Sequence, residues 1–157
     1  MIAVEPGAHA LQVLQKNIRL NGCDNVEVLP VGAGEGEASG QLHLHGDLSR
    51  ASFSQFEEEV DGGAGEETVR IARLDDLVPI GRPVSFVKID IEGYELLALR
   101  GAVRILRDRP VVLFECLPAA AVRAGLPRDG VWDLLSGVGL PLRTVDGRWS
   151  VDACGDY

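Results

Sequence analysis

Positive charge is scarce in this sequence, and its scarcity excludes one broad class of partner. The 157 residues include 15 basic and 24 acidic side chains, which gives a formal net charge of -9. Lysine and arginine are spread out and form no basic run. Proteins that hold nucleic acid use such runs, because binding releases the counterions of the phosphate backbone. The sequence therefore predicts no nucleic-acid partner, and its acidity favours solubility.

Long apolar runs and paired cysteines are also missing. No stretch approaches the roughly 20 apolar residues of a membrane span, and the opening MIAVEP is typical of a strand rather than of a leader segment. Cys23, Cys116 and Cys154 are scattered and form no CxxC pair, so neither a zinc site nor a disulfide framework is predicted. We expect free thiols, a cytoplasmic location and no membrane contact.

The length and the 46% apolar share indicate one globular domain over residues 1–157, without a linker or an internal repeat. Apolar runs predict strands at 2–4, 26–31, 41–47, 68–72, 85–90 and 110–115. Helical spacing predicts helices over 8–20 and 94–106, and weaker helical or turn-like segments over 119–127 and 131–139. In the predicted helix over 94–106, the expected core face consists of Leu96, Leu99, Val103 and Leu106.

The order of these elements predicts the fold class. Strands and helices alternate, which is typical of an α/β protein with a mainly parallel sheet and helices on both of its faces. Two features depart from that pattern. The glutamate- and glycine-rich segment 55–67 is expected to be a loop, and LPLRTV-DG-RWSV predicts a C-terminal antiparallel hairpin that turns at Asp146–Gly147.

Acidic residues follow three of the predicted strands: Glu5 after IAV, Asp90 after FVKI and Glu115 after VVLF. In open α/β sheets, ligands bind beyond the carboxyl ends of the strands. A carboxylate after the second strand of a nucleotide-binding unit can accept both ribose hydroxyls, and Glu5 fits this role. Each acid could instead cap a helix, which is how we interpret Glu95. Three such strand ends together favour a ligand-binding edge.

Parts of the sequence also fit a nicotinamide-dependent dehydrogenase or a metal site. A nicotinamide-dependent dehydrogenase would also use an acid such as Glu5, but the sequence has no GxGxxG. His43 and His45 share one face of a predicted strand and could bind a metal ion. Two histidines without a third ligand nearby are more often surface residues. A divalent cation shared by Asp90 and neighbouring acids is a second option, but no dedicated set of oxygen ligands is visible, so we rank it below simple base catalysis and predict no metal site.

Five segments occur in this order along the chain: EPGAHALQVLQKNIRLNG, VEVLPVGAGEGEASGQL, RLDDL, VKIDIEGYELLALRGA and RPVVLFE. Together they resemble the FkbM family of S-adenosylmethionine-dependent methyltransferases, and KIDIEGYE is the most specific of them. The resemblance runs from about residue 2 to residue 116. It implies a Rossmann-like methyltransferase fold, S-adenosyl-L-methionine as cofactor, and methyl transfer to an oxygen. The implied acceptor is a small-molecule or glycan hydroxyl.

The resemblance also implies roles for individual residues. Glu5, followed by Pro6, would hold the adenosine ribose, and the turn of Gly32, Ala33 and Gly34 would pass along the adenine. On the reaction side, Asp90 would face both the sulfonium and the acceptor. It is the best-placed general base, with Glu92 second. Gly93 would let the chain turn closely into its helix.

The family's first strand, with its glycine-rich DxGAxxG-like turn, has no counterpart in this chain. In the family's strand order, 3-2-1-4-5-7-6, it would lie between IAVE and FVKID. Each buried backbone group left unpaired there costs about 1–3 kcal/mol. Three outcomes stay open: the two strands pair directly, another chain supplies the strand in a homo-oligomer or complex, or the chain is N-terminally truncated. The alternative function is a non-catalytic domain of this fold that does not bind the cofactor alone.

Overall fold

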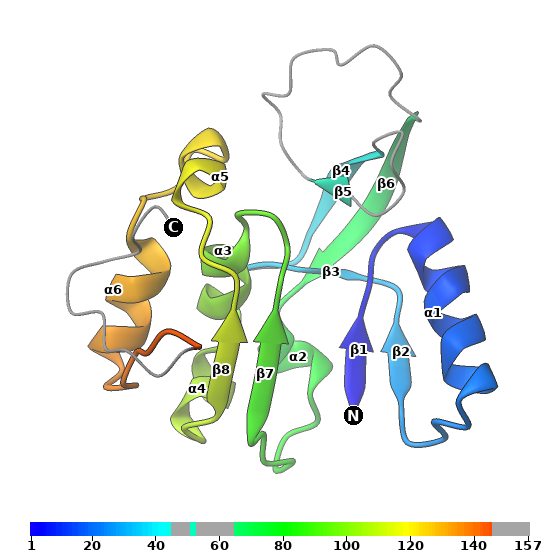
Figure 1. Ribbon diagram of the computed structural model, residues 1–157, viewed down its shortest axis with the longest axis horizontal. Coiled ribbons are helices and arrows are strands. Elements are labelled where there is room, and N and C mark those ends of the chain that lie inside the picture. The colour runs from blue at the N-terminus through cyan, green and yellow to red at the C-terminus, as the bar shows by residue number, and fades with distance from the viewer. Residues whose placement is uncertain (45–50, 53–64, 146–157) are drawn as a thin grey trace.

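Two separate pairs of parallel strands form the framework of the protein. The structure is a computed structural model, and it describes residues 1–44, 51–52 and 65–145. The elements form a mixed α/β arrangement (Figure 1). In chain order they are β1 (Ile2–Val4), α1 (Ala8–Leu20), β2 (Glu27–Leu29), β3 (Gly32–Ala33), β4 (Ala38–Leu44), β5 (Ala51–Ser52), β6 (Gly65–Ala72), α2 (Leu74–Leu77), β7 (Phe86–Ile89), α3 (Glu95–Arg100), α4 (Val103–Arg107), β8 (Val111–Phe114), α5 (Pro118–Arg123) and α6 (Gly130–Gly137).

The two parallel pairs are β1 with β2, and β7 with β8. Ala3 is opposite Val28 in the first pair, and Val87 is opposite Val112 in the second. Figure 1 shows all four arrows running in the same direction, with β7 and β1 on the inner sides of the two pairs. The carboxyl ends of the four strands therefore lie at one edge of the molecule, where the sequence predicts ligand binding.

The inner edge of β1 has no strand partner among the described residues. The amide of Glu5 donates to the carbonyl of Leu29 at 3.1 Å, so the odd-numbered residues of β1 bond to β2. Backbone groups alternate in direction along a strand, so those of Ile2 and Val4 point away from β2. The same alternation directs the backbone of Phe86 and Lys88 away from β8, because β8 bonds to Ser85 and Ile89. Direct pairing of β1 with β7 is therefore not found.

Within the described residues, a third sheet has no strand hydrogen-bonded to either pair. Its strand order is β3-β6-β4-β5, and β4 and β6 form a long antiparallel ladder that buries Leu42 and Val69. β6 begins at Gly65, so residues 65–67 belong to a strand and not to the predicted loop. The ladder extends these residues because each pairs with β4, from Gly65 opposite Leu44 to Glu67 opposite Leu42.

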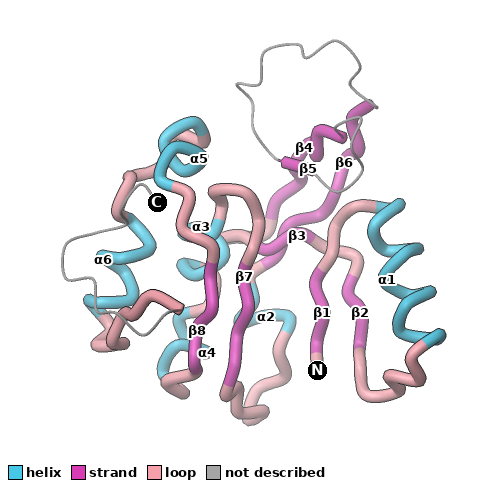
Figure 2. Tube along the Cα trace, viewed as in Figure 1, coloured by secondary structure: helices cyan, strands magenta, loops and turns pink. Residues whose placement is uncertain are grey.

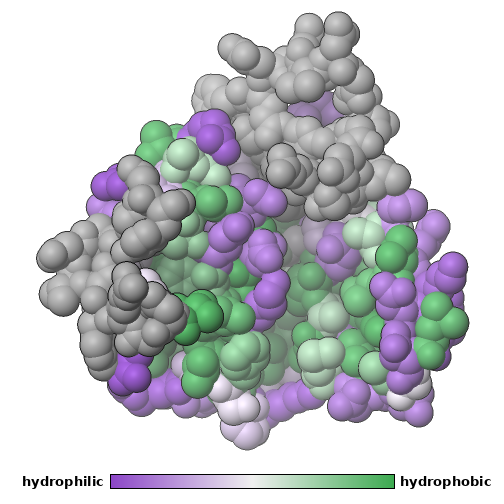
Figure 3. Space-filling view, in the orientation of Figure 1, coloured by the Kyte–Doolittle hydropathy of each residue, from purple (hydrophilic) through white to green (hydrophobic). Residues whose placement is uncertain are grey.

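The core lies on one side of β7 and β8. Ile89 packs there with buried residues from α3, α4, the turn between them and α6: Ala98, Leu99, Ala102, Ile105, Leu106 and Leu135. The opposite side of the pair is open: Phe86 is 56% exposed and Val111 is 64% exposed. Figure 3 shows apolar side chains on this face over β7 and β8. The prediction of helices on both faces is therefore wrong for this pair, as far as the described residues extend.

The predicted helix 94–106 is interrupted. α3 ends at Arg100, and α4 begins at Val103. A side chain at Gly101 would collide with the carbonyl oxygen of Gly34, so the backbones of these two glycines meet directly. The interruption turns Val103 outward, where it is 49% exposed, and the prediction of Val103 as a core residue is wrong. Leu96, Leu99 and Leu106 are buried, as predicted.

The other sequence predictions have mixed outcomes. The helix over 8–20 is confirmed, and Gly22 follows it with a φ of 62°. Residues 140–144 form no strand, and the predicted hairpin turn and its second strand lie outside the described residues. Cys116 is disulfide-bonded, so the prediction of free thiols is wrong for this residue.

None of the helices in the described ranges combines the length and the apolar composition that a membrane span requires.

Asp75 links α2 to the start of α4. Its carboxylate accepts hydrogen bonds from the amides of Arg104 at 2.8 Å and Ile105 at 3.0 Å. These are the second and third amides of α4, the ones that a helix cap normally satisfies. The Arg104 side chain in turn donates to the carbonyls of Asp75 and Val78. An acid distant in sequence therefore caps α4, which explains why a helix can begin there.

Asp75→Ala is expected to lower the free energy of unfolding by about 1–3 kcal/mol, because it leaves two partly buried amides without an acceptor. Urea unfolding monitored by circular dichroism measures this change. Asp76→Ala is the matched control, since Asp76 is the exposed neighbour in α2. Similar losses in the two variants would contradict the capping role.

Candidate functional site

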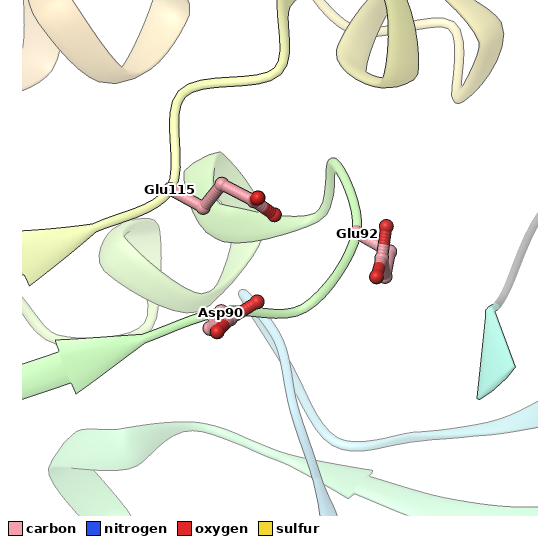
Figure 4. Close-up of side chains that lie close together, drawn as sticks. All are labelled: Asp90, Glu92 and Glu115. Atoms are coloured by element: carbon pink, nitrogen blue, oxygen red, sulfur yellow. The ribbon is translucent and has the colours of Figure 1, made fainter. Parts of the chain in front are cut away.

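Three carboxylates converge at the carboxyl ends of β7 and β8. Asp90 follows β7, Glu92 lies two residues further on, and Glu115 follows β8 (Figure 4). One ligand oxygen of each lies within 4.8 Å of those of the other two. The structure thus brings together the two predicted reaction-side residues, Asp90 and Glu92. It adds Glu115, which the sequence indicated only as a strand-end acid.

The loop that joins β7 to α3 (Figure 2) carries Asp90 and Glu92. Glu92 has a φ of 55°, which is uncommon for a residue with a side chain, and Gly93 has a φ of 103°. Gly93 is buried against α5, where an added Cβ would come within 2.7 Å of the backbone carbon of Ala120. The close turn that the sequence predicted at Gly93 is therefore present, and only glycine fits it without strain.

The charges in this cluster oppose one another. Partial desolvation, and then the negative charges of Asp90, Glu92 and Glu95, raise the pKa of Glu115 above its ordinary value. Lys88 offsets part of this repulsion: its Nζ donates to Asp90 Oδ2 at 2.9 Å. Carboxylates at this spacing can accept hydrogen bonds from a hydroxyl, take up its proton, or share a hard divalent cation.

Glu5 and Pro6 lie at the end of β1, at the same edge of the molecule but on the other parallel pair. Glu5 is partly buried, and its Oε1 accepts a hydrogen bond from the amide of Gly7 at 2.8 Å. Its Oε2 accepts none from the described residues. The next amide, that of Ala8, donates to Glu67 on β6 at 3.0 Å. The sequence did not indicate this second acid at the start of α1, because residue 67 was assigned to a loop.

Gly32, Ala33 and Gly34 form β3 and the residue after it, and Gly34 donates to the carbonyl of Ala72 at 3.0 Å. Ala33 and Gly34 line a cleft of about 590 Å³. Its wall also includes Tyr94 and Leu97, from the residue before α3 and from α3 itself. The cleft therefore connects the predicted adenine turn with the loop that carries Glu92.

Only one of the two histidines considered as metal ligands lies in the described part of the chain. His43 Nδ1 lies 3.3 Å from Glu66 Oε1 on the neighbouring strand, and His45 lies outside the described residues.

The model of the methyltransferase FkbM domain matches residues 1–125. The chain belongs to the FkbM methyltransferase family. No curated protein matches the chain. Among solved structures, this FkbM domain is similar to the crystal structure of methyltransferase FkbM from Methylobacillus flagellatus KT, with a TM-score of 0.55 and 22% sequence identity. The match covers 87% of this chain and 29% of that one, so the chain spans less than a third of its neighbour's length.

The raised pKa of Glu115 predicts a pH dependence of stability. A glutamate normally titrates near 4.5, and the folded FkbM domain holds the proton of Glu115 to higher pH than the unfolded chain does. The contribution of this group to stability is therefore complete below the ordinary pKa and is lost as the pH rises through the raised one. Glu115→Gln is expected to lose less stability than the unmodified protein between about pH 4 and about pH 7.

Urea unfolding at several pH values measures this difference. Glu27→Gln, on β2, is the control and should follow the unmodified protein. If the stability of Glu115→Gln declined with pH as steeply as that of the control, folding would not raise the pKa of Glu115.

Gly93→Ala is expected to reduce the free energy of unfolding by more than about 2 kcal/mol, since it combines strain at positive φ with a backbone clash. Gly22→Ala is the matched control: Gly22 also has a positive φ, but no atom lies within 4 Å of an added Cβ. Its cost should be the conformational one alone, about 1–2 kcal/mol. Equal losses in the two variants would mean that the backbone at Ala120 moves away from the added methyl group at no measurable cost.

Proposed function

We propose that this FkbM domain is an S-adenosyl-L-methionine-dependent methyltransferase that acts on a hydroxyl oxygen of a small molecule or sugar. The observation that carries the proposal is the convergence of Asp90 and Glu92 with Glu115 at the carboxyl ends of parallel strands. Ligands of open α/β sheets bind at this edge. Membership of the family supplies the reaction class.

The residues present fit such a cofactor in three respects. The free Oε2 of Glu5 can accept a ribose hydroxyl, as a carboxylate does well. The cleft beside Ala33 and Gly34 has apolar walls from Ile71 and Leu97, which suit a flat base. The acids at the end of β7 favour a positively charged sulfonium over a neutral group.

The chain's own residues have simple tasks in this reaction. When bound, the cofactor supplies a methyl group already activated by its positively charged sulfur. The protein must then place the acceptor oxygen in line with the methyl–sulfur bond, which accounts for much of the rate. In that reaction Asp90 would take the proton that the acceptor hydroxyl loses, with Glu92 as the second candidate. Lys88 keeps the Asp90 carboxylate oriented through their 2.9 Å hydrogen bond.

The proposed sheet is Rossmann-like, with β2-β1 and β7-β8 as two parts of one parallel layer. The common strand direction supports it, as do the inner edges of β1 and β7, which have no strand partner within residues 1–44, 51–52 and 65–145. A strand between them, from a second copy or from another polypeptide segment, would complete the layer by satisfying both edges. We further propose that the acceptor is a small molecule or glycan and that the domain has no nucleic-acid or membrane partner.

The proposal predicts that the domain binds S-adenosylhomocysteine, the product of the reaction, with a Kd in the micromolar range. Glu5→Gln keeps an oxygen for the amide of Gly7 but removes the charge offered to ribose. It should weaken binding about tenfold to a hundredfold, the cost of a hydrogen bond to a charged group. Isothermal titration calorimetry measures both constants.

Glu67→Gln is the matched control, because Glu67 is the other acid at the start of α1 and has no proposed contact with ribose. Its Kd should stay within about threefold of the unmodified value. The absence of S-adenosylhomocysteine binding by a folded domain would instead support the non-catalytic alternative.

A further inference from the structure

Glu95 is the one charged residue that is buried in the described part of the chain, with 4% of its surface exposed. It is the first residue of α3, where the helix dipole favours a negative charge. The sequence indicated this helix-start position but not the burial. A charge at a helix start can remain in water, and removing a carboxylate from water is costly unless hydrogen bonds within the protein replace those to water.

Among the described residues, Glu95 accepts hydrogen bonds from the loop that precedes it. Its Oε1 accepts from the amide of Ile91 at 3.0 Å and from the amide of Gly93 at 3.3 Å. These two amides flank Glu92, the residue with a φ of 55°. One oxygen atom therefore holds both sides of the least favourable backbone position in the loop.

This arrangement explains how three acids can face one another. A residue with a side chain at positive φ is strained, and the mutual repulsion of Asp90, Glu92 and Glu115 also favours a loop that swings outward. Hydrogen bonds to a charged acceptor are stronger than those between neutral groups. The two hydrogen bonds to Glu95 therefore oppose both effects and hold the loop in place.

We propose that Glu95 is a positioning residue: it fixes the loop between β7 and α3 and thereby aims Asp90 and Glu92 at the reaction site. It touches neither cofactor nor acceptor and acts through the amides of Ile91 and Gly93. Its effect on ligand binding rests on the proposed function. Its effect on the loop does not.

Two conservative variants separate the effect of the length of the Glu95 side chain from the effect of its charge. Glu95→Gln keeps an oxygen at the same distance and loses the charge. Glu95→Asp keeps the charge but is shorter by one carbon–carbon bond, about 1.5 Å. Its oxygen would then lie beyond hydrogen-bond distance of amides that are now 3.0 and 3.3 Å away. A generic need for an acid at the start of α3 would favour Asp over Gln, whereas positioning requires the reverse.

Amide hydrogen exchange measured by NMR tests the loop directly. The amides of Ile91 and Gly93 should exchange at least about tenfold faster in Glu95→Asp and within about threefold of the unmodified rate in Glu95→Gln. The amide of Leu99, in the core, is the reference for any change in overall stability. Faster exchange in the Gln variant than in the Asp variant, or equal rates in all three proteins, would overturn the proposal.

Calorimetry with S-adenosylhomocysteine tests the consequence for the site. The Kd should rise about tenfold in Glu95→Asp and stay within about threefold in Glu95→Gln. If the exchange rates change as expected but both variants bind like the unmodified protein, the loop is held without aiming the site, which refutes the positioning role. If the unmodified protein does not bind, the proposed function fails, and the exchange rates alone decide whether Glu95 fixes the loop.

Discussion

The contact between the backbones of Gly34 and Gly101 fixes how the parts of this domain meet. No side chain fits at Gly101, and the carbonyl of Gly101 also accepts a hydrogen bond from the amide of Asp75 at 2.9 Å. The contact therefore joins β3, the start of α2 and the interruption between α3 and α4. Because α3 is held there at its end and by Glu95 at its beginning, the loop between β7 and α3 has little freedom. The geometry of the acids thus depends on a glycine pair distant from them.

Much of the local structure could be predicted from the sequence because the signals are local. The spacing of Leu11, Leu14 and Ile18 and the Asn21–Gly22 ending give α1 its observed bounds. The apolar runs FVKI and VVLF coincide with β7 and β8. Helix ends and short apolar runs are decided within a few residues, and such features need no knowledge of tertiary contacts.

The features that the sequence did not reveal depend on partners far along the chain. The end of α3 at Gly101 requires Gly34, and the start of α4 requires Asp75. Glu115 was expected at the ligand-binding edge, but its approach to Asp90 and Glu92 depends on which strands are neighbours, here β7 and β8. Glu95 looks like an ordinary first-turn acid until its burial is known. In each case a residue's role is set by what the fold places beside it.

The helix that begins beside Glu5 has no buried residue anywhere along its length. β1 and β2, which it accompanies, likewise contain no buried residue, whereas β7, α3 and α4 share a well-packed core. Units with few buried side chains open at low cost, and among the described residues the segment from β1 to β2 is such a unit. A ligand that bridges Glu5 and Asp90 would bind only the closed form, so it would raise the local stability of that unit with concentration. Cofactor recognition and the local folding of this segment would then be one equilibrium.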